Sequence, residues 1–507
     1  MVTRRQLGSL ALGATGAAAL AACSGTSGSS SNKPASPRPS GAPDLKWTGT
    51  IKTGVQAYTP AVQGVKLAPG TAKLTAFGEA ADAFTAMYPG IKIEFLGSDY
   101  KYDASQMPTQ AAGGQLPDIW WQQYNIVNAS FPKGVATNLL PYMQKPNPFI
   151  PGNTKWQDVF SDEIFNMTKV DDNTQYCNNG DFVGTAFFYN EDAFTKAGIT
   201  AAPTTYPQLL DAAQKLKAAG ITPSALPVFQ TGYSWFSRLF LANFLGLDNL
   251  KKIDAFSKAK GISTSDVAVA WHQGIIDPRK NPAVLAWWPH AKDLYQTFDK
   301  SVTQLPKTPP AGSPNYETMF AGGKLGMVYD GTWLPTSVKS AGGSIKVGSF
   351  NWPSMAGIDQ YATDYDSANS VGGPNAAWQF FVSSPKSDHT LQEQGKLDAV
   401  IAWMQFFTTP EWNTKIVNEY ASFVPTLKGS KPLDSQKAIV DQLEKPLYAI
   451  QGGWEFTTET GDSLDALFQQ FILGQVQFGQ VQAKYVQIVE KGFNDYIKEH
   501  PIDFTKF

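Results

Sequence analysis

The strongest constraint on the fold of this 507-residue chain is the alternation of strand-like and helix-like patterns near its beginning. Residue periodicity predicts a strand at 74–77, an amphipathic helix at 79–88 and an alternating strand at 91–95. A third apolar run, LPDIWW at 116–121, follows a short helical stretch. Strands that alternate with helices form parallel sheets covered on both faces, so we expect an α/β protein.

A second stretch, residues 184–220, passes from a strand pattern to two helix patterns. The apolar run at 186–189 predicts a strand, and a short helix should follow it. Thr205 can cap the next helix, and Gln208 three residues later completes a capping box. This stretch contains no obvious catalytic group.

Length and charge narrow the class of protein. A chain of 507 residues exceeds what one hydrophobic core organises, so about two large lobes are expected. The net charge is −2 and Lys and Arg form no cluster, which argues against a nucleic-acid partner. Aromatic residues make up 13% of the chain and charged residues only 17%. We expect about two thirds of the aromatic rings in the core, with flat apolar surface left for a site.

The first residues carry export information. Arg4 and Arg5 precede an apolar, small-residue run at 7–22, and Leu-Ala-Ala-Cys at 20–23 resembles a bacterial lipobox. The resemblance implies a signal peptide at 1–22, a lipid on Cys23 and a protein exported to the outer face of the cytoplasmic membrane, with the twin arginines suggesting one route. A flexible tether is predicted at 23–70, although Trp47 and Tyr58 indicate that its end packs on something.

Cysteine and histidine are too few for a metal or disulfide framework. Cys177 is the only cysteine besides Cys23, so it has no partner for an internal disulfide if Cys23 carries a lipid. Two cysteines and four scattered His residues form no recognisable zinc motif. We predict no metal and no cofactor, and we expect Cys177 to be an inert thiol.

One motif is specific enough to suggest a family. The segment YETMFAGGKLGMVYDGTWLPTSV at 316–338 matches the pattern F-x-x-G-x-x-AM-x-x-x-G-x-W, with Gly326 where Ala is usual. The YN-x-D and AG patterns of residues 189–198, and the YPGIKIEF and LPDIWW motifs, occur in the same order. Together they resemble family 1 extracellular solute-binding proteins, the sugar-binding subunits of bacterial ABC importers.

The resemblance implies a two-lobed, type II binding-protein fold. Each lobe is expected to be a mostly parallel sheet flanked by helices, and about three hinge crossings should join the lobes. The expected divisions are 71–183 with 376–423 for lobe 1, and 184–375 with 424–507 for lobe 2. Crossings are expected near Val183, Gly372 to Pro374 and Phe423 to Pro425.

The resemblance also implies function: a monomer that captures a sugar or oligosaccharide between its lobes and delivers it to an ABC permease, with no catalytic residues. Ligands of open parallel sheets bind beyond the carboxyl ends of strands, which adds candidates after the first and third predicted strands. The predicted contacts are Phe77, Gly78, Glu79, Trp121, Gln122, Tyr124, Asn125, Gln230, Tyr233, Trp235, Gly331, Trp333, Gly372 and Trp454.

Two alternatives remain at this point. A secreted glycoside hydrolase would also use aromatic rings, but it needs two facing carboxylates about 5 to 10 Å apart. Candidates are Glu79, Asp99, Asp118, Asp330 and Asp364, none of them in a recognisable hydrolase motif. A surface adhesin fits the alternating α/β pattern less well. For Trp333, the alternative to a sugar platform is a ring that only packs the start of a helix.

Overall fold

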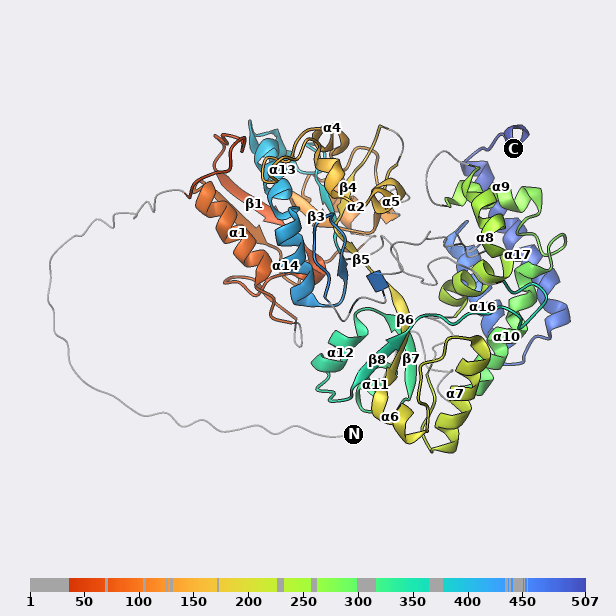
Figure 1. The fold of residues 1–507 in the computed structure, drawn as a ribbon. Coiled ribbons are helices and arrows are strands. Elements are labelled where there is room, and N and C mark those ends of the chain that lie inside the picture. The colour runs from red at the N-terminus through yellow and green to blue at the C-terminus, as the bar shows by residue number, and fades with distance from the viewer. Residues whose placement is uncertain are drawn as a thin grey trace, which may run out of the picture.

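The computed structural model describes residues 36–68, 72–103, 106–124, 126–127, 131–170, 173–225, 232–256, 262–298, 316–363, 377–433, 436, 439–440, 450, 452–453 and 455–507. These residues form two lobes joined by a narrow hinge (Figure 1). Within this part of the chain, no helix combines the length and the apolar character needed to cross a bilayer. The α/β, two-lobed fold class is therefore confirmed.

Lobe 1 is built on a five-stranded sheet in the order β2-β1-β3-β9-β4. The strands are β1 (Gly49–Thr53), β2 (Ile91–Phe95), β3 (Ile119–Trp121), β9 (Gln379–Val382) and β4 (Cys177–Asn179). β1 pairs in parallel with β2 and β3, whereas β9 is antiparallel to both of its neighbours. The sheet is mixed because the chain returns from lobe 2 to supply β9.

The helices of lobe 1 cover this sheet, and α1 and α13 contribute part of its aromatic core. They are α1 (Ala76–Met87), α2 (Met107–Ala112), α4 (Leu140–Met143), α5 (Asp162–Met167), α13 (Lys396–Phe407) and α14 (Pro410–Tyr420). Short 3-10 turns lie at η1 (Gln56–Tyr58), η2 (Trp156–Val159) and η4 (His389–Gln392). Thr409 caps α14, since its side chain accepts from the Trp412 amide.

The first strand of the sheet differs from the sequence prediction. No strand forms at 74–77, because α1 already begins at Ala76, and the strand that starts the β-α-β unit is β1 at Gly49–Thr53. The Glu419 carboxylate accepts hydrogen bonds from the amides of Thr75 and Ala76 and so caps α1 from a distant helix. The segment predicted as the end of a flexible tether is thus part of lobe 1.

Lobe 2 has a small sheet and a large helical body. The sheet has the order β7-β6-β8 and consists of β6 (Thr185–Asn190), β7 (Met327–Gly331) and β8 (Val347–Phe350). The central strand β6 is antiparallel to both neighbours, so the expected mostly parallel sheet is wrong for this lobe.

The helices of lobe 2 pack around a second aromatic core. They are α6 (Glu191–Lys196), α7 (Tyr206–Ala218), α8 (Ser237–Asp254), α9 (Thr264–Gln273), α10 (Ala283–Thr297), α11 (Tyr316–Ala321), α12 (Leu334–Ser340), α16 (Thr458–Ile472) and α17 (Phe478–Glu499), with a π-helical turn at Gly232–Phe236 and a 3-10 turn η6 at Phe504–Lys506. The capping box of Thr205 and Gln208 at the start of α7 is confirmed.

The hinge is centred on two short strands. β5 (Asp181–Phe182) leads directly into β6 of lobe 2, and β10 (Val424–Pro425) pairs antiparallel with β5 (Figure 1). A second passage lies between residues 363 and 377, and the predicted crossing at Gly372 lies outside the described residues. Leu427 still packs in the core of lobe 1 and Ile450 in that of lobe 2, so the third passage follows β10.

Candidate ligand-binding site

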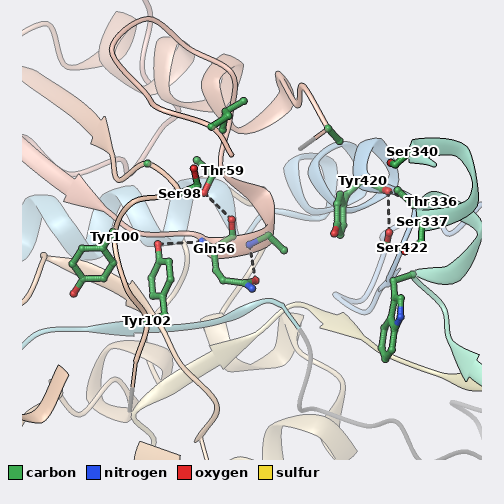
Figure 2. A pocket seen from close by; sticks show the side chains of 15 residues that line it. Gln56, Thr59, Ser98, Tyr100, Tyr102, Thr336, Ser337, Ser340, Tyr420 and Ser422 are labelled. Carbon is green, nitrogen blue, oxygen red and sulfur yellow. Dashed lines mark hydrogen bonds between the residues drawn. The ribbon is translucent and has the colours of Figure 1, made fainter. Parts of the chain in front are cut away.

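A cavity of about 480 Å³ lies between the two lobes. Its walls come from η1 after β1, the loop after β2, helix α12 and the end of α14 (Figure 2). The lining residues are Gln56, Ala57, Thr59, Leu67, Ala72, Gly97, Ser98, Tyr100, Tyr102, Trp333, Thr336, Ser337, Ser340, Tyr420 and Ser422. None of these residues carries a charged side chain, so the site combines aromatic faces with neutral polar groups.

The wall from lobe 1 is held by hydrogen bonds within its loops. The Gln56 amide donates to the Tyr102 hydroxyl at 3.2 Å (Figure 2). The Tyr100 hydroxyl donates to Gln110 Oε1, outside the lining, at 2.9 Å. The Tyr102 ring meets Tyr100 and Trp121 edge to face, with centroids at 4.9 and 5.8 Å. Burial raises the pKa of Tyr100 to about 12 and that of Tyr102 further, so both hydroxyls stay neutral.

The wall from lobe 2 is the first turns of α12 and the residue before it. Trp333 is partly buried and packs against both lobes, since it joins the edge of the lobe 1 core and meets Trp235 at 6.2 Å between ring centroids. Gly331 lies beneath the indole, where a Cβ atom would collide with its six-membered ring. Leu334 and Val338 are buried on the opposite side of α12 and fix the helix in lobe 2.

The two walls meet at the end of α14. Thr336 Oγ1 donates to the Tyr420 carbonyl at 3.3 Å, which joins α12 of lobe 2 to α14 of lobe 1. The Tyr420 ring packs on Tyr58, one residue after the lining segment of η1, at 5.8 Å between centroids. The cavity therefore lies beside the hinge.

Backbone strain is concentrated at this cavity. Among the described residues, only Gln56 and Ala421 are non-glycine residues with positive φ, at 47° and 55°. Gln56 lines the cavity, and Ala421 lies between the lining residues Tyr420 and Ser422. Left-handed conformations at non-glycine residues cost about 1 kcal/mol or more and persist where a site requires them, so their positions point to this cavity as functional.

A buried carboxyl ties the hinge segments together behind the cavity. Asp181 of β5 accepts from the Tyr58 hydroxyl at 2.6 Å and from the Trp378 amide at 3.0 Å. Burial raises the pKa of Asp181 to about 7 and that of Tyr58 well above its usual value. One carboxyl thus links η1, β5 and the segment that leads into β9.

Several residues predicted from the sequence gather around the cavity. Trp333 lines it, and Trp121, Trp235 and Gly331 contact lining residues. Trp121 is partly exposed, whereas its neighbour Trp120 is buried between Phe131 and Phe381, as expected for adjacent strand residues.

Gln122 and Tyr124 lie behind this wall. Gln122 is buried and its side chain donates to the Tyr102 carbonyl at 3.3 Å, and the Tyr124 amide donates to Gln379 Oε1 at 2.7 Å. Neither lines the cavity. Gln122 supports the loop that carries Tyr102, and the Tyr124 backbone is held by β9.

Three other predicted residues lie on α1, away from the cavity. Phe77 and Gly78 are buried on α1, where the Phe77 ring packs with Trp378 and Phe407 in the core of lobe 1. Glu79 on the same helix pairs with Lys415. Their prediction depended on a strand at 74–77 that does not form.

Tyr233 is also core, because its ring packs against Trp287, Trp288 and Phe468 of lobe 2. Asn125, Gln230, Gly372 and Trp454, with Cys23, lie outside the described residues.

Sequence reasoning missed most of the lobe 1 wall. Gln56, Tyr100 and Tyr102 were not predicted, although Tyr100 and Tyr102 follow the correctly predicted strand β2 and the strand-end rule applies to them. Gln56 gave no such signal, since it was assigned to the tether. Tyr420, at the end of α14, has no local pattern that marks it as a lining residue.

The carboxylates considered for hydrolysis do not converge on the cavity. Asp99 is exposed and lies in the chain between the lining residues Ser98 and Tyr100, but it is not itself part of the lining. Asp118 is buried and pairs with Lys396 at 2.8 Å, Asp330 is buried in β7, and Asp364 lies outside the described residues. Burial raises the pKa of Asp118 to about 6 and that of Asp330 well above its usual value. The described lining contains no carboxylate. Cys177 is likewise buried in β4, which raises the pKa of its thiol to about 12.

Two lobes, a strand hinge and a cavity between them define a hinged binding protein. The chain belongs to the family of bacterial extracellular solute-binding proteins, whose family model matches residues 79–443. The family resemblance of the sequence motifs is therefore confirmed, and membership implies an exported protein.

Solved structures show the same fold at low identity. The GacH receptor of Streptomyces glaucescens, solved unliganded and with acarbose and an acarbose homolog, has a TM-score of 0.59 at 15% identity and covers 89% of this chain and 100% of its own. The substrate-binding protein Lmo0181 of Listeria monocytogenes, in complex with cycloalternan, has a TM-score of 0.55 at 16% identity and covers 90% of this chain and 100% of its own. A probable secreted solute-binding lipoprotein of Streptomyces coelicolor has a TM-score of 0.55 at 16% identity and covers 88% of this chain and 98% of its own. No protein of curated function matches the chain.

Proposed function

We propose that this protein binds a sugar or oligosaccharide between its lobes and delivers it to the permease subunits of an ABC importer. The observation that carries the proposal is the cavity itself, in which the aromatic rings of Tyr100, Tyr102, Trp333 and Tyr420 are combined with neutral hydroxyls. A pyranose presents an apolar C–H face and a rim of hydroxyls, which such a wall matches. The sugar ligands of GacH and Lmo0181 support the same class.

The platform of this site is Trp333. Its ring is partly exposed, lines the cavity and is held from below by Gly331 and from the side by Trp235. Trp235 flanks the platform, Trp121 packs on Tyr102 in the facing wall, and Gln122 supports the loop that carries Tyr102. Tyr124 lies behind that wall, held by Gln379 of β9. The protein acts as a binder and not as a hydrolase, consistent with a described lining that contains no carboxylate.

A sugar panel tests the proposal. Titration calorimetry with the full chain should find at least one oligosaccharide bound tightly, and chromatography of the same mixture should find it unchanged. Small-angle scattering should show a smaller radius of gyration with saturating ligand, because closure brings the lobes together. Turnover of the sugar that depends on one carboxylate would refute the binding role.

The lipid anchor is a second part of the proposal. The Leu-Ala-Ala-Cys tetrad at 20–23 supports acylation of Cys23, and the similar fold of a solute-binding lipoprotein from Streptomyces coelicolor is consistent with it. The protein then acts as a monomer on the outer face of the cytoplasmic membrane. Cys23→Ala should release it from membranes or stop its maturation, and unchanged membrane association would refute the anchor. Lysine at both Arg4 and Arg5 should block export only if the twin-arginine route is used.

A further inference from the structure

Most hydroxyls in the cavity wall already donate their protons to the protein. Each such oxygen keeps lone pairs for a ligand but has no proton to give without breaking its own bond. The donor and acceptor pairs are Thr59 Oγ1 with Gln56 O at 2.7 Å, Ser98 Oγ with Lys66 O at 2.9 Å, Tyr100 Oη with Gln110 Oε1 at 2.9 Å, and both Thr336 Oγ1 and Ser422 Oγ with Tyr420 O at 3.3 Å. The wall is therefore rich in acceptors.

Two groups have the opposite polarity, and they are neighbours. Tyr102 Oη accepts from the Gln56 amide at 3.2 Å, which leaves its own proton for a ligand. Gln56 Oε1 accepts from the Ala57 amide at 2.6 Å, so the side-chain NH₂ of Gln56 also stays available. The hydroxyls of Ser337 and Ser340 on α12 and of Tyr420 on α14 can donate or accept. The donors that are fixed by bonds to the protein are thus confined to one corner of lobe 1.

Among the described residues that line the cavity, none offers a cation to an anionic ligand. Arg238 of α8 in lobe 2 is not one of them, and burial lowers its pKa while the nearby Glu455 opposes that shift. A carboxylate or phosphate only accepts hydrogen bonds, and it would lose its water against a wall of acceptors. A hydroxyl or an N–H group of a sugar would instead donate to that wall.

We propose that the cavity selects saccharides by hydrogen-bond polarity. It takes neutral sugars and amino sugars, whose O–H and N–H groups donate to the wall, and it rejects uronic acids and sugar phosphates. The inference rests on the proposed function and adds the class of saccharide to it. The donor corner at Tyr102 and Gln56 fixes the orientation of the bound ring.

A matched set of probes tests the selection. β1,4-linked trisaccharides of glucose, glucosamine, N-acetylglucosamine and glucuronic acid, with the corresponding α1,4-linked galacturonate and neutral galactose compounds, are titrated into the full chain. At least one neutral or amino compound should bind, and its uronate partner should bind at least about tenfold more weakly, a difference of about 1.4 kcal/mol. Equal or tighter binding of the uronate overturns the selection while the sugar-binding function stands. If none of the compounds binds, both the selection and the sugar-binding function are refuted.

Two variants test the cause. Ser340 is exposed at the end of α12, and Ser340→Lys places a cation on the wall, so uronate affinity should rise at least about fivefold with little change for neutral sugars. Ser340→Gln, of similar length and without charge, should show no such gain.

Tyr102→Phe keeps the ring and removes the free proton, and it should weaken the binding of every sugar about fivefold. Tyr142→Phe, outside the cavity, should leave sugar binding unchanged. An unchanged uronate affinity in Ser340→Lys, or an unchanged sugar affinity in Tyr102→Phe, contradicts the proposal.

Discussion

The two walls of the cavity are built in different ways. Lobe 1 presents loops, in which Gln56, Tyr100 and Tyr102 are held by hydrogen bonds and one residue is in a left-handed conformation. Lobe 2 presents one helix, α12, whose outer residues are fixed because its inner residues are packed in a core. The first wall can fix the direction of hydrogen bonds, and the second supplies a rigid flat surface. A sugar needs both, one for its hydroxyl rim and one for its C–H face.

The hinge that joins these walls gives the largest expected effect. The folded protein holds the Asp181 proton up to about pH 7, whereas an unfolded aspartate loses it near pH 4. Between these values the unfolded state binds fewer protons, so stability falls as pH rises, by up to about 4 kcal/mol in total. Asp181→Asn should flatten this part of the pH dependence.

Thermal unfolding from pH 4.5 to 8 measures the effect of Asp181→Asn. Asp118, with a pKa raised to about 6, contributes with the same sign at lower pH. The difference between wild type and variant therefore isolates Asp181. Parallel curves for the two proteins would mean that Asp181 does not hold a proton at the hinge.

The helical wall can be disturbed without removing its platform. In Gly331→Ala the new Cβ meets the six-membered ring of Trp333, so the indole must move while the backbone conformation stays accessible. We expect about tenfold weaker sugar binding, or about 1.4 kcal/mol. Gly479→Ala is the matched control, because its Cβ would meet open space on α17. Unchanged affinity in Gly331→Ala would show that the indole position is not critical.

The smallest expected effect is on stability, at the left-handed residue Ala421 beside the cavity, and its direction distinguishes strain from an ordinary helix position. Ala421 has a φ of 55°, which glycine adopts freely, so Ala421→Gly should leave stability unchanged or raise it by up to about 1 kcal/mol. The exposed helical Ala483→Gly should instead lose about 0.5 to 1 kcal/mol. Melting temperatures of the two variants compare them, and a similar loss in both would remove the evidence for strain beside Tyr420.

The helical wall was predictable from the sequence, and the loop wall was not. The motif around Trp333 combines a buried strand, glycines and a tryptophan at fixed spacing, and these local signals were sufficient. Gly49–Thr53 has only Ile51 and Thr53 buried, which is a weak strand pattern. The apolar run at 74–77 was a stronger pattern, and it was wrong because Glu419, far away in sequence, caps a helix there.

Because the first strand was predicted at 74–77 and not at Gly49–Thr53, part of the predicted site was also misplaced. Phe77, Gly78 and Glu79 were assigned to the end of the first strand, the place that Gln56 occupies in the structure. Tyr233 and Trp235 were equivalent in the sequence, since both flank a helix start, and only packing against Trp287 and Trp288 places Tyr233 in the core. The two lobes followed from the motifs that carry the family resemblance, and the place of Trp333 beside the cavity followed from the same motifs. The facing loops, by contrast, are placed by tertiary contacts.

The most direct test of the central claim is calorimetric titration of one bound sugar into Trp333→Ala and Trp412→Ala. Both tryptophans are partly exposed and pack on the edge of the lobe 1 core, but only Trp333 lines the cavity. Trp333→Ala should cost at least about 2 kcal/mol of binding, as central aromatic contacts do, with both variants folded by their melting curves. Trp412→Ala should bind like wild type. A folded Trp333→Ala protein with wild-type affinity would contradict the claim that the sugar is held between these two walls.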